Sequence, residues 1–165
     1  MAFDAQFTIR AGEPADAAAI REMIACLARE TIGDRQQVLS VDDVLRYGFG
    51  PEKAFESIVA ARDGKVVAVM ILYDEFSTWR GKKGVYVLDI FIAPTARGFG
   101  VGRRLIARAA EWGRSRGASY IRLSVDQENI YAVNFYEAIG FAEGSHDRVF
   151  ILSGDAFDGI AGEEA

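Results

Sequence analysis

The sequence predicts an α/β fold in which a mixed sheet is flanked by helices. Three observations predict it: apolar residues form runs of strand length in some segments, they recur at helical spacing in others, and one strand–loop–helix unit has three alternating glycines. The expected order of elements is β-α-α-β-β-β-α-β-α-β. At 165 residues, the chain is about one domain long, and we expect a single domain over 1–165.

The first half of the chain is expected to form two helices and three strands. Pro14 and Asp16 come just before apolar residues at helical spacing, as at the start of a helix. Two β-branched apolar runs are separated by Arg62-Asp63-Gly64, and Asp-Gly between two strands is a strong hairpin signal. In chain order, we expect a strand at 7–10, helices at 17–30 and 41–47, and strands at 55–61 and 65–73.

The second half is expected to alternate strands with helices. A polar loop at 77–84 precedes an almost continuously apolar strand at 85–92, in which Asp89 is the exception. Apolar residues then recur at helical spacing up to Gly117, a natural helix terminator. The remaining expected elements are that helix at 101–116, a strand at 119–125, a helix at 130–139 ended by Gly140, and a strand at 149–152.

Composition and charge disfavour several classes of partner. The formal net charge is −5, and no Lys/Arg cluster is long enough to follow a phosphate backbone, so nucleic-acid binding is not expected. No stretch approaches the ~20 apolar residues that span a bilayer, and residues 1–6 lack the features of a signal peptide. Cys26 is the single cysteine, so no internal disulfide can form. We expect a cytoplasmic location. Cys26 lies in a helical pattern, and we expect it to be a packed side chain without a further role.

The segment Arg97-Gly98-Phe99-Gly100-Val101-Gly102 joins the apolar strand to the following helix. The start of a helix presents unpaired backbone N–H groups and the positive end of the helix dipole. Glycines let a ligand approach this backbone, and Arg97, Arg103 and Arg104 add positive charge. The pattern fits a pyrophosphate; the alternative is a tight turn whose glycines only permit packing. Because the glycine spacing fits neither G-x-G-x-x-G nor a P-loop, a nucleotide-binding oxidoreductase is disfavoured.

Two motifs in this order resemble those of the GNAT superfamily of N-acetyltransferases. Pro94-x-x-Arg97-Gly98-x-Gly100-x-Gly102 is similar to its R-x-x-G-x-G/A acetyl-CoA signature. Residues 129–141, Asn-Ile-Tyr-Ala-Val-Asn-Phe-Tyr-Glu-Ala-Ile-Gly-Phe, are similar to its N-x-x-A-x-x-x-Y-x-x-x-G-F segment. The resemblance implies a GNAT fold, with a mostly antiparallel central sheet whose central strands splay apart. It also implies direct transfer of an acetyl group from acetyl-CoA to a primary amine, with no metal.

The resemblance further implies which residues hold the cofactor. The backbone of residues 90–92 would pair with the pantetheine arm like an added strand, and amides of the glycine loop would hold the pyrophosphate. Asn129 stands where the family usually places a polar contact, although Asn also suits a helix N-cap. Family members often pair through edge strands, which implies a possible homodimer. The expected cofactor-binding residues are Ile90, Phe91, Ile92, Arg97, Gly98, Phe99, Gly100, Val101, Gly102, Arg103 and Asn129.

Two residues are expected to be catalytic. Family members use a tyrosine of the later helix as general acid, and Tyr136 matches it; the alternative is a packed helix tyrosine. Residues 86–92 resemble the Y-L-E-D-L/F-F/Y-V segment of the diamine and polyamine branch, but Leu88 replaces the Glu that is a candidate base there. Asp89 remains, and a carboxylate in an apolar strand is costly unless paired or hydrated. We expect it to contact the substrate ammonium or to act as a base through water; the alternative is a structural hydrogen bond.

The expected acceptor is a small cationic amine. A protein N-terminus or lysine, or an aminoglycoside, is the alternative acceptor, and a non-catalytic acyl-CoA-binding module is the competing hypothesis. Asp74 and Glu75 either line the acceptor cleft or are solvated acids, and Trp79 either caps that cleft or is a surface aromatic. His146, the only histidine, lies beside Asp147 but in no cluster of His, Cys and carboxylate residues, so neither a zinc site nor a serine-type triad is expected.

Overall fold

A computed structural model describes residues 6–33, 38–144 and 150–162 of the chain. The chain divides into two compact units, Met1–Asp126 and Gln127–Ala165. The first unit holds the sheet with helices α1, α2 and α3, and the second holds helices α4 and α5.

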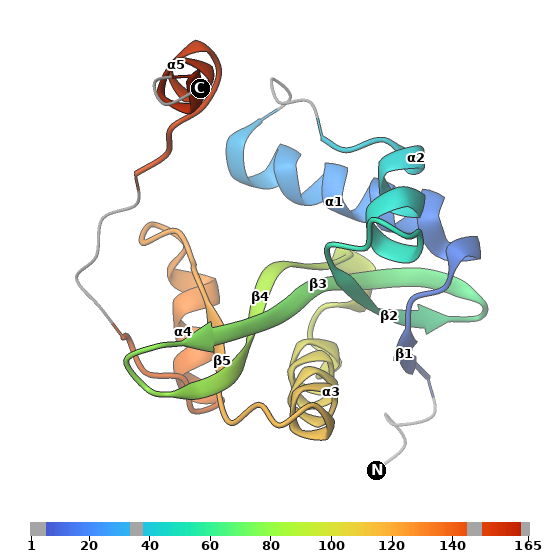
Figure 1. The fold of residues 1–165 in the computed structure, drawn as a ribbon. Helices are drawn as coiled ribbons and strands as arrows, with labels where there is room; N and C mark the ends of the chain where they lie inside the picture. The colour runs from blue at the N-terminus through green and yellow to red at the C-terminus, as the bar shows by residue number, and fades with distance from the viewer. Residues whose placement is uncertain (1–5, 34–37, 145–149, 163–165) are drawn as a thin grey trace. The chain divides into compact units, whose positions relative to one another are not determined.

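Five strands of the first unit form one sheet in the order β1-β2-β3-β4-β5 (Figure 1). Strands β1 to β4 form an antiparallel meander, whereas β5 runs parallel to β4. Parallel neighbours need a long crossover, and here α3 supplies it. The mixed, mostly antiparallel sheet expected from the sequence is therefore confirmed. Its strands are β1 (Thr8–Ala11), β2 (Glu56–Arg62), β3 (Lys65–Ser77), β4 (Lys82–Ile92) and β5 (Ile121–Leu123).

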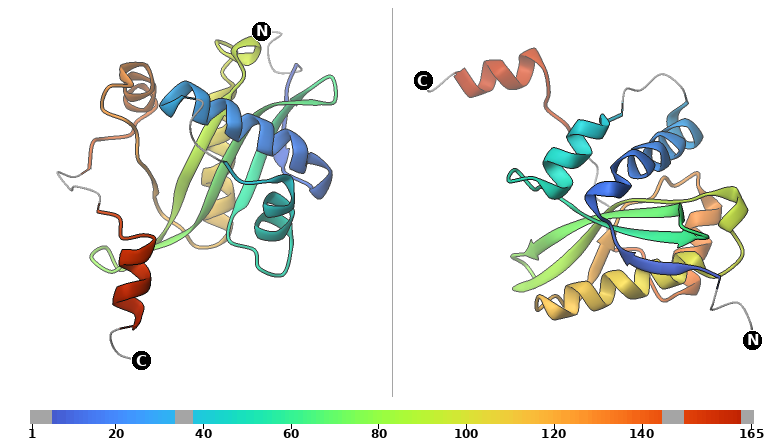
Figure 2. Two further views of the ribbon diagram at one scale, coloured as in Figure 1. Left: turned by 90° about the horizontal axis from the view of Figure 1, so that it is seen from above. Right: turned by 90° about the vertical axis from the view of Figure 1, so that its right-hand side faces the viewer.

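Helices cover both faces of this sheet. Figure 2 shows α1 and α2 on one face and α3 on the other. A core of buried side chains from β2, β3 and β4, including Val69, Ile71 and Phe91, packs under α1. On the other face α3 buries an apolar stripe that includes Leu105. The helices are α1 (Ala17–Ile32), α2 (Val41–Val44) continued by the π-helix η2 (Leu45–Phe49), α3 (Val101–Ser115), α4 (Ile130–Ala138) and α5 (Asp155–Gly162), with 3₁₀ turns η1 (Pro14–Asp16) and η3 (Pro94–Ala96).

The β2–β3 and β3–β4 hairpins differ in how well the sequence predicted them. The β2–β3 turn is Asp63-Gly64, and both residues have positive φ, of 51° and 75°, as a type I′ turn requires. The polar loop expected at 77–84 is shorter, at 78–81, because β3 continues to Ser77 and β4 begins at Lys82. Asp74 and Glu75, just before this stretch on β3, find arginine partners, described below.

Two other expectations are corrected. The strand expected at 119–125 is only Ile121–Leu123, because β4 no longer offers it a partner beyond that point. In the strand expected at 149–152, residues 150–152 join no ladder of the described chain and are exposed, and Val149 lies outside the described residues. A strand needs a neighbour for its backbone hydrogen bonds. Helix α5, which follows, was not expected.

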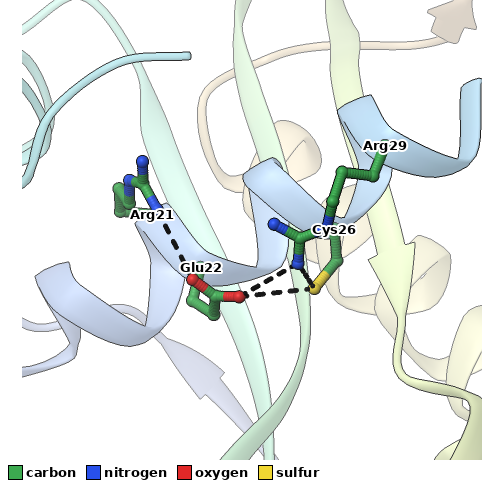
Figure 3. Close-up of polar contacts among 4 residues, drawn as sticks. All are labelled: Arg21, Glu22, Cys26 and Arg29. Atoms are coloured by element: carbon green, nitrogen blue, oxygen red, sulfur yellow. Dashed lines mark hydrogen bonds and ion pairs between the residues drawn. The ribbon is translucent and has the colours of Figure 1, made fainter. Parts of the chain in front are cut away.

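Cys26 lies in a row of charged side chains along α1 (Figure 3). It packs against the core under α1, as expected, but it is only half-buried. Its thiol donates to Glu22 Oε1 at 3.7 Å and accepts from Arg29 Nη2 at 3.0 Å, and Glu22 also contacts Arg21 at 3.5 Å. These contacts tie successive turns of the helix together.

Candidate active site

The last two strands of the described sheet, β4 and β5, separate after a short stretch of pairing. Strands β4 and β5 pair only over Val85–Val87 and Ile121–Leu123. The β3–β4 register shifts just beyond, so that Leu88 has no partner on β3. Such a β-bulge bends a strand and redirects its side chains, and bulges are common next to active sites. From Leu88 to Ile92, β4 therefore presents an edge that no β5 residue of the described chain covers. The splayed strands expected from the sequence are confirmed.

Backbone groups along this open edge are directed outward in an alternating pattern. The amide of Ala93 donates to Val67 O on β3 at 2.9 Å. Because successive residues of a strand direct their amide and carbonyl to opposite neighbours, Phe91 faces β3, whereas Ile90 and Ile92 face away from it. The carbonyl of Ile92 accepts a bond from a side chain, Arg97 Nε, at 2.9 Å. The Ile90 backbone and the Ile92 amide are thus available to an extended ligand, whereas the Ile92 carbonyl already has a partner.

The glycine loop has the geometry of an anion site. Gly98 and Gly100 have φ of 81° and 73°, and a Cβ built at either would meet no atom of the described chain within 4 Å. Gly100 is also the N-cap of α3, and no side chain caps that helix. The first amides of a helix have no intrahelical partner, so those of Val101, Gly102 and Arg103 point out of the loop. Space, free amides and the helix dipole together fit a pyrophosphate.

The arginines near the loop have different roles. Arg97 donates to Ile92 O and to both carboxylate oxygens of Glu30 at 2.9 Å, and its guanidinium lies 5.7 Å from the ring centre of Phe91. Its side chain therefore joins the loop, β4 and α1. Arg104 donates to Phe7 O at 3.0 Å. Arg103 is exposed and has no partner among residues 6–33, 38–144 and 150–162. Of the three cations near the loop, Arg97 and Arg104 are already engaged, whereas Arg103 has no partner among the described residues.

Asp89 lies on the sheet face that α1 covers. It stands opposite Ile71 in the ladder, and directly opposed residues share a face. Its side chain is half-buried, and no hydrogen bond or ion pair reaches it from the part of the chain that the structure describes. Burial raises the pKa of Asp89 above its ordinary value. A half-buried carboxylate without a partner is costly, so its environment fits a bound cation or water.

Next to Asp89 on the same face is a cluster that we call the Tyr–Arg cluster: Tyr73, Tyr86, Glu75, Arg122 and Ser124. Tyr73 and Tyr86 stack with ring centres 5.2 Å apart, and the Tyr86 hydroxyl lies 2.9 Å from Ser124 Oγ. Arg122 Nε donates to Glu75 Oε1 at 2.7 Å, and its guanidinium lies 4.9 Å from the Tyr86 ring centre. Arg122 and Ser124 are not among the expected site residues; their alternation with the apolar Ile121, Leu123 and Val125 was the available signal.

Asp74 and Glu75 lie on opposite faces of the sheet. Asp74 pairs with Arg116 of the residues following α3 at 2.6 Å, on the α3 face, and this lowers the pKa of Asp74. Glu75 belongs to the Tyr–Arg cluster. Of the two, only Glu75 can therefore line an acceptor site on the face of Asp89, and neither is a merely solvated acid. Trp79, at the β3–β4 turn, is fully exposed.

The second unit contains Asn129 and Tyr136. The side chain of Asn129 caps α4 by accepting from the Ala132 amide at 3.1 Å, which is the structural role considered for it. Tyr136 is buried. The rings of Phe135 and Phe141 pack edge-on against its ring, with ring centres 5.2 and 5.5 Å from the Tyr136 ring centre. Burial raises the pKa of Tyr136 to about 12. Its hydroxyl is thus protonated throughout the neutral range, as a general acid must be.

No group of three or more His, Cys, Asp and Glu side chains in the described ranges could hold a metal ion, and His146 lies outside these ranges. No helix among the described residues is long and apolar enough to cross a membrane.

Comparisons with known proteins agree with this fold. Residues 20–141 match the model of the acetyltransferase (GNAT) family. Thialysine N-epsilon-acetyltransferases of Mus musculus and Sus scrofa are 32% and 33% identical, over 93% and 96% of this chain and 96% and 99% of their own lengths. An aminoglycoside acetyltransferase from an uncultured soil metagenomic sample has the same fold, with a TM-score of 0.77 at 16% identity over 92% of this chain and 99% of its own. The chain therefore belongs to the acetyltransferase (GNAT) family and is an N-acetyltransferase that uses acetyl-CoA.

Proposed function

We propose that this enzyme transfers the acetyl group of acetyl-CoA directly to the terminal amine of a small cationic acceptor of the thialysine kind. The observation that supports it most is the half-buried Asp89 carboxylate, unpartnered within the described residues and one residue beyond the Leu88 bulge. A carboxylate there would attract an alkylammonium ion. The names of relatives that match over nearly their whole length support the same class of acceptor.

The residues present fit acetyl-CoA. We propose that the pyrophosphate binds the amides from Gly98 to Arg103, with the Arg103 side chain adding charge. The pantetheine arm would lie along β4, bonded to the Ile90 and Ile92 backbones, with Phe91 buried between them. We propose that Arg97 and Phe99 shape the glycine loop and that Asn129 shapes the start of α4, so that all three belong to the cofactor site. When bound, acetyl-CoA supplies the thioester that the amine attacks.

The chain's own groups would then perform three tasks. Asp89 orients the ammonium and accepts its proton through water, so that the neutral amine can attack. The Leu88 backbone, which the bulge leaves without a β3 partner, polarises the thioester carbonyl. The Tyr136 hydroxyl gives its proton to the departing thiolate. No covalent enzyme intermediate is needed.

A thiol-release assay with acetyl-CoA and a panel of amines tests the proposal. We expect turnover with thialysine and similar small amines, and little with a peptide N-terminus or an aminoglycoside. A good reaction with a peptide N-terminus alone would replace the small-amine proposal by the protein acceptor. CoA binding without any turnover would support the non-catalytic module.

The rate should climb with pH. An alkylammonium has a pKa near ~10, and Leu88 cannot accept a proton where the related branch has Glu. Asp89, as a carboxylate, is a much weaker base than an alkylamine, so the supply of free amine still limits attack, and kcat/KM should rise with pH between about 6 and 9 without a plateau at the low end. A plateau at low pH would instead reveal a strong general base.

Replacing Gly100 with valine should weaken CoA binding by about tenfold or more. The new side chain would fill the space next to the loop amides, and it also strains a residue with positive φ. Gly117→Val is the matched control: Gly117 has φ of 85° and open space around it at the other end of α3. Calorimetry with CoA should give a reduced affinity for Gly100→Val and an unchanged one for Gly117→Val. Equal affinities in two folded variants would exclude the loop as the pyrophosphate site.

We also propose that the two units form one catalytic domain, since the matching family region, 20–141, runs through the boundary at Asp126. A homodimer and a cytoplasmic location remain proposals. The first rests on the family resemblance, and the second on Cys26 being the only cysteine.

A further inference from the structure

The Tyr–Arg cluster contains a guanidinium that is held in place yet can still bind a ligand. Arg122 uses Nε and Nη2 for Glu75, and its plane lies over the Tyr86 ring. Its Nη1 group has no partner among the described residues, and the side chain is 62% exposed. Because a guanidinium has five N–H donors in a planar fork, one edge can be fixed while the other binds a carboxylate.

Arg122 also shares a sheet face with Asp89. It stands beside Tyr86 in the β4–β5 ladder, its guanidinium lies over the ring of Tyr86, and Tyr86 stacks on Tyr73. Tyr73 lies two residues from Ile71, the cross-strand partner of Asp89, and alternate residues of a strand share a face. A carboxylate and a guanidinium thus lie along one face, with two stacked aromatic rings beside them.

The spacing of these two charges matches one kind of acceptor. Tyr86 and Asp89 are three residues apart on a bulged strand, which is roughly 7–10 Å at ~3.3 Å per residue. An extended amino acid of lysine size has about 7 Å between its terminal nitrogen and its carboxylate carbon, across bonds of ~1.5 Å. With its terminal amine at Asp89, such a molecule would place its carboxylate within reach of Arg122.

We propose that Arg122 binds the α-carboxylate of the acceptor, so that the enzyme selects free amino acids with a side-chain amine over diamines and polyamines. This rests on the proposed function and names the substrate class within it. Glu75 holds Arg122 in position, and the Tyr73–Tyr86 stack lies along the apolar stem of the substrate.

Thialysine and its decarboxylated counterpart, bis(2-aminoethyl) sulfide, test this on the wild-type enzyme. They share the reacting amine and differ in the carboxylate. We expect kcat/KM for thialysine to exceed that for the diamine by about tenfold or more, as for loss of one charge-assisted contact, after correction for the two equivalent amines of the diamine. Thialysine amide, which has no carboxylate charge, should behave like the diamine.

Variants locate the effect at Arg122. Arg122→Gln should lower kcat/KM for thialysine about tenfold or more but change kcat/KM for the diamine less than threefold. Arg122→Lys keeps a positive charge beside Glu75, and its kcat/KM for thialysine should lie between those of the wild type and Arg122→Gln. Arg116→Gln is the matched control. Like Arg122, Arg116 pairs with an acid of β3, here Asp74, and its guanidinium carbon lies 4.8 Å from an aromatic ring centre, that of Trp112; unlike Arg122, it lies on the α3 face. Arg116→Gln should change neither value.

The outcomes separate this inference from the proposed function. Equal kcat/KM for thialysine and the diamine in the wild type, or an equal loss of both in Arg122→Gln, would overturn the role of Arg122 while small-amine acetylation stands. The absence of thiol release with every small amine would instead overturn the proposed function. Calorimetry with CoA on each variant identifies any loss that comes from an altered fold.

Discussion

Replacing Tyr136 with phenylalanine is expected to lower kcat about 100-fold and to leave CoA affinity unchanged. One acid–base residue contributes at least ~10²-fold to a rate, and the hydroxyl acts only on charge that develops on the departing thiolate. Phenylalanine keeps the ring that packs edge-on against Phe135 and Phe141, so the fold of α4 should be preserved. A loss confined to kcat, measured at saturating acetyl-CoA and amine, identifies an interaction made only in the transition state.

The pKa of Tyr136, raised to about 12 by burial, adds a second readout. A tyrosine with an ordinary pKa near ~10 would lose its proton in the basic range, and activity would fall there. Because the pKa of Tyr136 is about 12, the wild-type kcat should show no decline in the basic range up to about pH 10. Tyr131→Phe is the control, because Tyr131 is an exposed tyrosine of the same helix. If kcat of Tyr136→Phe stays within about twofold of wild type, Tyr136 has only a packing role.

The sequence predicted those features that depend on neighbouring residues. Gly98 and Gly100 need positive φ for local reasons, and Asp63-Gly64 forms its turn without help from distant strands. The helical stripe of α3 and the apolar strand before it are likewise local patterns. The order of elements in the first unit and its sheet type follow from these signals, and both are confirmed.

The features that the sequence could not predict depend on residues far apart in the chain. The bulge at Leu88 exists only relative to the register of β3. The ion pair of Arg97 could not be expected, because its partner Glu30 is 67 residues away. Asp74 and Glu75 are adjacent in sequence, yet their arginines come from opposite faces of the sheet. Tertiary pairing of this kind determines which charges remain available for substrates.

Asp89→Asn should make the enzyme less active and more stable. The amide keeps the shape of the side chain but removes the charge that would attract the substrate ammonium. We expect kcat/KM for the best cationic amine to fall roughly tenfold to a hundredfold, as for loss of a charge-assisted contact of ~1.5–3 kcal/mol. Steady-state kinetics with thialysine measures this, and an unchanged kcat/KM would mean that Asp89 has a structural role.

The gain in stability follows from the raised pKa of Asp89. The folded state holds the proton of this carboxyl more tightly than the unfolded state does, so wild-type stability falls as pH rises from the ordinary pKa, 3.8, through the raised value. The amide of the Asp89→Asn variant has no proton to lose, and the variant should escape that fall. Its advantage in free energy of unfolding should therefore be absent below the ordinary pKa and complete above the raised one.

Asp74→Asn provides a control of opposite sign on the neighbouring strand. The pKa of Asp74 is lowered by Arg116, so its charge contributes stability above its ordinary pKa that is lost as pH falls through the lowered one. Asp74→Asn should thus be slightly less stable than wild type at neutral pH, the effect being small because both partners are about half exposed, and its kcat/KM should not change. Denaturant unfolding at several pH values compares the two variants. A destabilised Asp89→Asn protein at neutral pH would mean that Asp89 has a partner in the folded enzyme, and its place as a binding site for the acceptor would be lost.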